Sequence, residues 1–399
     1  MASDKNEEHA SATIAVHGGE RVDEHPFGAV VSPVFHSTSY GFKSFAEMRE
    51  YAQGRLPESF FYSRYANPTV AEAERKIAEL EGAESAVVTC SGSSATFCAL
   101  VAIAEAGDEI IACDSIYGGT TKIITELLSR FQIRSRFISL ADVPRLAELA
   151  TERTRAFWFE TPANPINRLV DLEQAADAAR KAEIFSIVDS TFATPILQRP
   201  LKFGIDAVMH SATKYLGGHA DVTAGVVAGS QEFINRVRRI SVRIGATLDP
   251  AAAYLLLRGM KTLELRVRAS CENALQLARA LSQHKQVARV YYPSLEDNPD
   301  YNLARKQMNG CGGGVVAIDL RGGEAEAERF FDALRLARSA PSLGGVETLV
   351  SYPLYSSHVG FTDEQLKAAG VSAATIRFAV GIEDARELIA DVTQALEKI

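Results

Sequence analysis

Short apolar runs alternate along this chain with stretches in which apolar residues recur every three or four positions. Runs of the first kind are typical of buried strands, and the second pattern is typical of amphipathic helices. The pattern predicts strands at residues 85–89, 109–112, 156–160 and 184–188, and helices at residues 69–81, 95–105 and 172–182. Strands that alternate with helices of about 10 to 15 residues indicate βαβ units. We therefore predict an α/β domain with a doubly wound, mainly parallel sheet.

Residues with distinctive chemistry follow two apolar runs. Lys214 follows the run at residues 207–209, with Ser211 and Thr213 just before it, and Asp189 closes the run at residues 184–188. A lysine can condense with an aldehyde, hydroxyls can bind a phosphate, and a fixed carboxylate keeps a pyridine nitrogen protonated. Open α/β sheets bind ligands at the carboxyl ends of their strands. The two positions therefore predict a site for pyridoxal 5'-phosphate (PLP).

Each of these residues also has a simpler interpretation. A lysine in a glycine-containing loop is usually a solvated surface charge, and an aspartate after a strand often caps a turn or a helix. The Gly/Ser loop at residues 90–94 precedes a predicted helix and is either an anion site or an ordinary N-cap. Arg377 lies between apolar residues of a predicted strand. A buried arginine needs an anion, which can be a structural carboxylate or a substrate carboxylate.

Composition narrows the class of protein. With 399 residues, of which 47% are hydrophobic and 23% charged, the chain can bury a large core and form two domains. A net charge of -8 disfavours nucleic acid as a partner, and no run reaches the roughly 18 apolar residues of a membrane span. Residues 1–9 are polar and acidic, unlike a signal peptide. We expect a cytoplasmic protein that acts on a small molecule, with no nucleic-acid or membrane partner.

Two other kinds of site are disfavoured by their motifs. Five cysteines show no C-x-x-C spacing and eight histidines show no H-E-x-x-H pattern, so we predict no metal site. Glycines at residues 310–314 precede the strand predicted at residues 315–320, whereas a dinucleotide-binding motif has its glycines after a strand. A dehydrogenase is therefore disfavoured.

The chain is expected to form three segments. Residues 1–63 lack a clear period and form an N-terminal arm, and residues 64–260 form the large PLP-binding domain. A helical stretch at residues 250–284 leads into a smaller C-terminal domain at residues 261–399.

With these pieces in place, the chain resembles the Cys/Met-metabolism (trans-sulfuration) family of PLP enzymes. This family includes cystathionine γ-lyase, methionine γ-lyase, cystathionine γ-synthase and O-acylhomoserine sulfhydrylase, and the similarity runs from about Val16 to Leu396. The motifs that carry it are Tyr62-Ser63-Arg64-Tyr65-Ala66-Asn67-Pro68-Thr69, Ser91-Gly92, Tyr117-Gly118-Gly119-Thr120, Asn164-Pro165, Val188-Asp189-Ser190-Thr191-Phe192-Ala193-Thr194-Pro195, Ser211-Ala212-Thr213-Lys214-Tyr215 and Ser342-Leu343-Gly344-Gly345.

The resemblance implies a fold, an assembly and residue roles. The fold would be PLP fold type I, as in aspartate aminotransferase, with a small C-terminal α+β domain, in a homotetramer of two dimers. Lys214 would carry the cofactor and shuttle protons, Asp189 would hold its pyridine nitrogen, and Tyr117 would stack on its ring and could act as an acid. The phosphate would be bound by Gly92, Ser93, Ser211 and Thr213, together with Tyr62 and Arg64 of the neighbouring subunit. The substrate carboxylate would be held by Arg377, Ser342 and Asn164.

The implied reaction is a γ-elimination on a sulfur amino acid such as cystathionine or methionine, giving 2-oxobutanoate and ammonia. Alternatives are γ-replacement, as in cystathionine γ-synthase or O-acylhomoserine sulfhydrylase, and γ-elimination on another γ-substituted amino acid. A binding protein that only kept the fold is a third class, which the complete residue set disfavours.

Four features depart from the family pattern and bear on the substrate. Gly119 replaces a cysteine usual in methionine γ-lyases, and Pro341 replaces a glutamate usual in cystathionine-processing members. Residues 352–358 differ from the common version of that segment. Lys122 lies where several relatives have an arginine, although a lysine on a helix is more often a surface charge.

Overall fold

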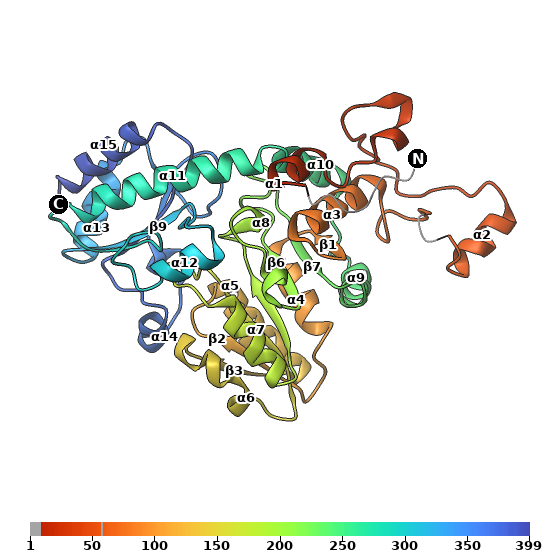
Figure 1. The fold of residues 1–399 in the computed structure, drawn as a ribbon, viewed down its shortest axis with the longest axis horizontal. Helices are drawn as coiled ribbons and strands as arrows, with labels where there is room; N and C mark the ends of the chain where they lie inside the picture. Colours follow the sequence, from red (N-terminus) through yellow and green to blue (C-terminus); the bar gives the residue numbers. More distant parts are fainter. Residues whose placement is uncertain (1–8, 57–58) are drawn as a thin grey trace.

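The computed structural model of the protein describes residues 9–56 and 59–399 (Figure 1). Residues 1–8, which carry most of the expectation about a signal peptide, lie outside the described residues, as do residues 57 and 58 of the predicted arm. Two β-sheets dominate the fold, and the long helix α11 (Leu263–Ser282) extends from beside the larger sheet across the smaller one (Figure 1). Within the described ranges, no helix has both the length and the apolar character that crossing a membrane requires.

The larger sheet has seven strands in the order β1-β7-β6-β5-β4-β2-β3. Its strands are β1 (Ser85–Thr89), β2 (Glu109–Cys113), β3 (Arg134–Ile138), β4 (Thr154–Glu160), β5 (Phe185–Asp189), β6 (Ala207–His210) and β7 (Gly225–Gly229). Neighbours from β6 through β3 are parallel, whereas β7 is antiparallel to both β1 and β6. The predicted α/β class with a mainly parallel sheet is confirmed.

Helices cover both faces of this sheet. Val87 of β1 belongs to the core under α4 (Gly92–Val101), α7 (Leu172–Lys181) and α9 (Gln231–Ile244). Its neighbour Val88 belongs to the opposite core, under α3 (Pro68–Glu81) and α10 (Pro250–Met260). This alternation is the period of two that a strand buried on both faces requires.

Two helix boundaries differ from the prediction. The helix predicted at residues 95–105 is α4, which begins at Gly92 because the Ser91 side chain caps it by accepting a hydrogen bond from Ser94 N at 3.1 Å. The stretch predicted at residues 250–284 is two helices, because α10 ends at Met260 and α11 begins at Leu263.

The smaller sheet has five strands in the order β10-β11-β12-β9-β8. They are β8 (Val287–Tyr291), β9 (Val315–Leu320), β10 (Arg338–Ser339), β11 (Leu349–Ser351) and β12 (Thr375–Ala379). Helices α11, α13 (Glu324–Ala333) and α15 (Ala385–Leu396) pack on it around a separate core. The other α-helices are α1 (Ser11–His17), α2 (Phe45–Ala52), α5 (Gly118–Lys122), α6 (Leu146–Leu149), α8 (Thr194–Leu197), α12 (Tyr301–Gln307) and α14 (Asp363–Ala368).

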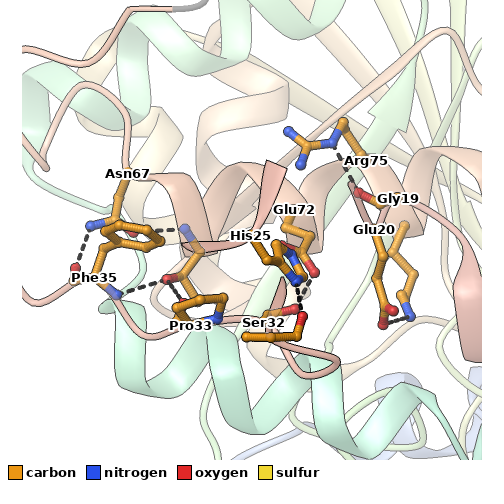
Figure 2. Close-up of polar contacts among 12 residues, drawn as sticks. Gly19, Glu20, His25, Ser32, Pro33, Phe35, Asn67, Glu72 and Arg75 are labelled. Carbon is orange, nitrogen blue, oxygen red and sulfur yellow. Dashed lines mark hydrogen bonds and ion pairs between the residues drawn. The ribbon is translucent and has the colours of Figure 1, made fainter. Parts of the chain in front are cut away.

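The N-terminal segment is fastened to α3 by polar contacts (Figure 2). Glu72 of α3 accepts a hydrogen bond from Ser32 and lies 3.3 Å from the His25 ring, and Arg75 Nε donates to Gly19 O at 3.0 Å. Beyond these contacts the segment carries α2 away from the rest of the molecule (Figure 1). The segment boundaries at residues 63 and 260 stay predictions.

Candidate active site

A cavity of about 490 Å³ lies at the carboxyl ends of β4, β5 and β6, and residues of the second sheet region close it. Most of the predicted site residues line this cavity: Gly92, Ser93, Tyr117, Asn164, Asp189, Ser211, Thr213, Lys214, Ser342 and Arg377. The carboxyl ends of parallel strands bring these residues together although they are far apart in sequence.

Lys214 follows β6 and is held by the second sheet region. Its Nζ donates a hydrogen bond to Ser342 Oγ at 2.8 Å. Burial, and secondarily the nearby Arg377, lower the pKa of Lys214 to about 8. The amine is therefore much closer to its nucleophilic neutral form at neutral pH than an ordinary lysine.

Ser342 connects the lysine to the arginine. Its carbonyl oxygen accepts a hydrogen bond from Arg377 Nη2 at 3.0 Å, while its hydroxyl accepts from Lys214. Its backbone has a φ of 98°, which is rare outside glycine. Such backbone strain is common at functional sites, where the surrounding contacts maintain it.

Asp189 ends β5 with its carboxylate buried at the cavity. Its Oδ1 accepts hydrogen bonds from Thr191 N at 3.0 Å and from Thr191 Oγ1 at 2.5 Å. Burial raises the pKa of Asp189, and the two bonds from Thr191 oppose that rise by favouring the carboxylate. Oδ2 accepts no hydrogen bond from the described residues, so one oxygen remains for a cationic ring nitrogen.

Glu160 is a cavity residue that the sequence interpretation did not single out. It ends β4 directly beside Asp189 in the parallel register. Its Oε2 accepts a hydrogen bond from Tyr117 N at 2.7 Å, and its Oε1 accepts one from Asn164 N at 3.0 Å. Burial, followed by repulsion from Asp189, raises the pKa of Glu160 well above its ordinary value. The same signal that identified Asp189, a carboxylate closing a predicted strand, was present here at residue 160.

The start of α4 has the features of a phosphate site. The N–H groups of Gly92 and Ser93 belong to the first turn of a ten-residue helix, where the helix dipole favours an anion. A Cβ at Gly92 would lie 3.0 Å from Ser211 Oγ, so glycine lets the two loops approach closely. The hydroxyl of Thr213 already donates to Ala224 O at 3.1 Å, whereas Ser211 Oγ makes no hydrogen bond with the described residues. Ser211 is thus better placed than Thr213 to donate to a phosphate.

Arg377 is a buried cation with neutral partners. Its Nη1 donates to Asn164 Oδ1 at 2.8 Å and its Nη2 to Ser342 O, while its buried Nε has no partner in the described structure. Burial lowers the pKa of Arg377 to about 10. No carboxylate of the described chain forms an ion pair with it, so the guanidinium is suited to an anionic group of a ligand.

Tyr62 and Arg64 are not brought to this cavity. Tyr62 is exposed, and Arg64 Nη1 donates to Val242 O at 2.9 Å, on another part of the surface. Tyr117 lines the cavity at the start of α5, and a Cβ on Gly119 would overlap its ring. The ring therefore occupies space that a side chain at position 119 would need. Lys122 is exposed on α5, as a surface charge would be.

The cavity suits PLP on structural grounds. It offers an amine of lowered pKa at Lys214, a buried carboxylate with an unused oxygen at Asp189, and the free N-terminus of a helix at Gly92. These are the three groups that an aldehyde, a pyridine nitrogen and a phosphate require.

Known proteins are similar to this chain over almost its whole length. The sequence is 40% identical over 388 residues to the L-methionine gamma-lyase of Pseudomonas putida, which covers 97% of each chain. The cystathionine gamma synthase of Xanthomonas oryzae pv. oryzae, crystallised with aminoacrylate and cysteine, superposes with a TM-score of 0.91 at 35% identity over 98% of each chain.

A third relative shows the cofactor. The putative O-acetylhomoserine (thiol)-lyase of Campylobacter jejuni, whose crystal structure contains N'-pyridoxyl-lysine-5'-monophosphate, has a TM-score of 0.93 at 30% identity and covers 98% of this chain and 100% of its own. The model of the family "Cys/Met metabolism PLP-dependent enzyme" matches residues 12–397. The chain therefore belongs to the Cys/Met metabolism family of PLP-dependent enzymes.

Proposed function

We propose that this enzyme is a γ-lyase that cleaves the C–S bond of a sulfur amino acid such as methionine or cystathionine, releasing a thiol, 2-oxobutanoate and ammonia. The observation that carries the proposal is the pairing of Arg377, a buried guanidinium without an anion, with the Lys214 amine in one cavity. An α-amino acid supplies both a carboxylate for the arginine and an α-carbon that must exchange protons with a base.

The residues that would hold PLP are those already placed around the cavity. Lys214 would bind its aldehyde carbon, Asp189 its pyridine nitrogen, and the Gly92 and Ser93 N–H groups with the Ser211 hydroxyl its phosphate. When bound, the cofactor supplies an electron-accepting ring. Thr213 would contact the phosphate through a bridging water, because its hydroxyl donates to Ala224 O.

The chain's own residues then bind and orient the substrate and move its protons. Arg377, with Asn164 and Ser342, holds the α-carboxylate. Lys214, whose pKa is lowered to about 8, takes the proton from the α-carbon and afterwards the β-carbon, since one amine can reach adjacent carbons in turn. Tyr117 lines the cavity and would donate a proton to the departing sulfur.

A γ-replacement enzyme is the second candidate. The structural similarity to a cystathionine gamma synthase favours it, and both reactions need the same cofactor residues.

Among the described residues that line the cavity, only Glu160 and Asp189 are acidic, and both lie at the strand ends. Pro341 lies at the wall instead of a carboxylate, which favours an uncharged γ-substituent over the distal ammonium of cystathionine.

We also propose that the enzyme is a cytoplasmic homotetramer whose Tyr62 and Arg64 complete the phosphate site of a neighbouring subunit. The exposure of both residues, away from the Lys214 cavity of their own chain, supports this. Several large apolar side chains of the same arm are also exposed, and the most exposed are Phe27, Val30 and Phe45. Surfaces of this kind usually mark contacts between proteins.

Parallel product assays test the proposed reaction. The purified, PLP-loaded enzyme is given L-methionine, L-cystathionine, or O-succinylhomoserine with cysteine, and 2-oxobutanoate and cystathionine are measured. Keto acid from methionine or cystathionine is the expected result and identifies the leaving group. Cystathionine from the third mixture, with little keto acid from the first two, would instead establish γ-replacement. A colourless protein without a cofactor absorption band would contradict both reactions.

A further inference from the structure

Glu160 is a buried carboxylate for which the proposed reaction has so far no use. It is 4% exposed, and it accepts hydrogen bonds from the backbone N–H groups of Tyr117 and Asn164. The next strand places a second buried carboxylate, Asp189, at the neighbouring position. Burying two carboxylates side by side without a bound cation is unfavourable, because each loses hydration and they repel each other.

The hydrogen bonds of Glu160 join two walls of the cavity. One oxygen accepts from the backbone N–H of Tyr117, at the start of α5, and the other accepts from the backbone N–H of Asn164, in the loop after β4. Asn164 in turn accepts a hydrogen bond from Arg377 through its side-chain oxygen. A single side chain thus links the aromatic wall to the group that binds the carboxylate.

We propose that Glu160 is a positioning residue, which rests on the proposed function: it sets the position of the Tyr117 wall relative to the Asn164–Arg377 pair. The substrate lies between these two walls. Fixing their separation orients the α-carbon with respect to Lys214. A carboxyl group is suited to this because each of its two oxygens can accept a hydrogen bond, so N–H groups from two different loops are held at once.

The test replaces Glu160 by glutamine and uses Glu109 as a matched control. The amide in Glu160→Gln has one acceptor oxygen, and its NH2 group must face the other N–H, so one wall is released while the shape is kept. Glu109 is also a buried carboxylate of the larger sheet, bonded to Thr154 Oγ1 and Arg136, but it lies at the opposite edge, where β2 begins. Glu109→Gln therefore makes the same replacement of a buried carboxyl group by an amide, but away from the cavity.

Three quantities are measured on PLP-loaded enzyme: cofactor content, the visible circular dichroism of the bound cofactor, and kcat and KM separately. In Glu160→Gln, we expect full cofactor content, an altered dichroic band and a loss of roughly 100-fold in kcat/KM with a raised KM, because misplacement by about 1 Å has effects of that size. Glu109→Gln is expected to keep the wild-type band and kinetics. A folded, loaded Glu160→Gln enzyme with the wild-type band and KM would overturn the proposal.

Amide hydrogen exchange on the wild-type enzyme provides a second measurement that needs no variant. The amide protons of Tyr117 and Asn164 lie in loops but are expected to exchange slowly, because both donate to a buried acceptor. Rapid exchange at both positions would overturn the proposal even if Glu160→Gln failed to fold. Exchange and circular dichroism are recorded without substrate. An enzyme that fails the product assays but passes these two tests would contradict the proposed reaction and not the role of Glu160.

Discussion

The polar side chains in the cavity around Lys214 bond to one another, whereas the segment around Arg64 lies outside this cavity. In the cavity, one chain supplies mutually bonded groups, because Lys214 and Arg377 both bind Ser342. The Arg64 guanidinium instead lies on the surface, with a backbone carbonyl as its hydrogen-bond acceptor and the Tyr62 and Tyr65 rings beside it. The difference indicates that one chain supplies the groups proposed for proton transfer and carboxylate binding, whereas the proposed phosphate site also depends on a neighbouring chain.

Replacing Lys214 by alanine is expected to have the largest effect. It removes the amine proposed to bind the cofactor and to move protons, so turnover should fall by at least about 1,000-fold. The far-ultraviolet circular dichroism should be unchanged, because the backbone hydrogen bonds of Lys214 are kept and its side chain is not part of a hydrophobic core. Turnover within tenfold of wild type would remove Lys214 from the mechanism.

Replacing Arg377 by lysine should come next. An ammonium group cannot hold Asn164 and Ser342 while also presenting a planar pair of donors to a carboxylate. We expect KM to rise by roughly 10- to 100-fold, corresponding to the loss of charged hydrogen bonds, with cofactor content unchanged. An unchanged KM would show that the substrate carboxylate binds elsewhere.

Replacing Arg64 by alanine tests the other side of the contrast. We expect the dissociation constant for PLP to rise about tenfold, since one charged hydrogen bond to the phosphate is lost. Co-expression with the Lys214→Ala chain gives the sharper result. At a PLP concentration that loads the wild-type enzyme but not the Arg64→Ala enzyme, mixed dimers contain one intact site if Arg64 acts on a neighbour, and about one quarter of the wild-type activity should return. No recovery would place the action of Arg64 within its own chain.

The smallest effect concerns pH. Because the free-base amine attacks an aldehyde, cofactor-free protein should take up PLP faster as the pH rises, and the rate should level off above the Lys214 pKa of about 8. An ordinary lysine would give a rate that rises up to a pH of about 10.4. Stopped-flow absorbance measures the rate, and a continued increase between pH 9 and 10 would contradict the lowered pKa.

The sequence predicted those parts of the site that follow clear apolar runs. Lys214 and Asp189 were placed correctly at one sheet edge because their strands are continuous in hydrophobicity and end in a distinctive polar residue. Strand β7 carries a glycine at each end, and β3 is an edge strand with two arginines, so neither gives a clear signal. The sequence places Glu160 at the end of a predicted strand, but it does not identify the groups that donate hydrogen bonds to this side chain. Both of its hydrogen bonds come from backbone N–H groups, which any residue could supply.

The direction of strand β7 determines the spacing between the loops that follow β1 and β6. It is antiparallel to its neighbours, so β1 and β6 point the same way and the loops after them open at one edge, separated by two strand spacings, or about 10 Å. The strand begins at Gly225, where a Cβ would overlap the carbonyl of Ser91. The antiparallel strand therefore separates the two loops that are proposed to bind the phosphate, and the glycine at its start leaves room for the Ser91 backbone. A methyl group at position 225 would overlap the backbone of Ser91 and Gly92 and would therefore increase the distance between the two loops.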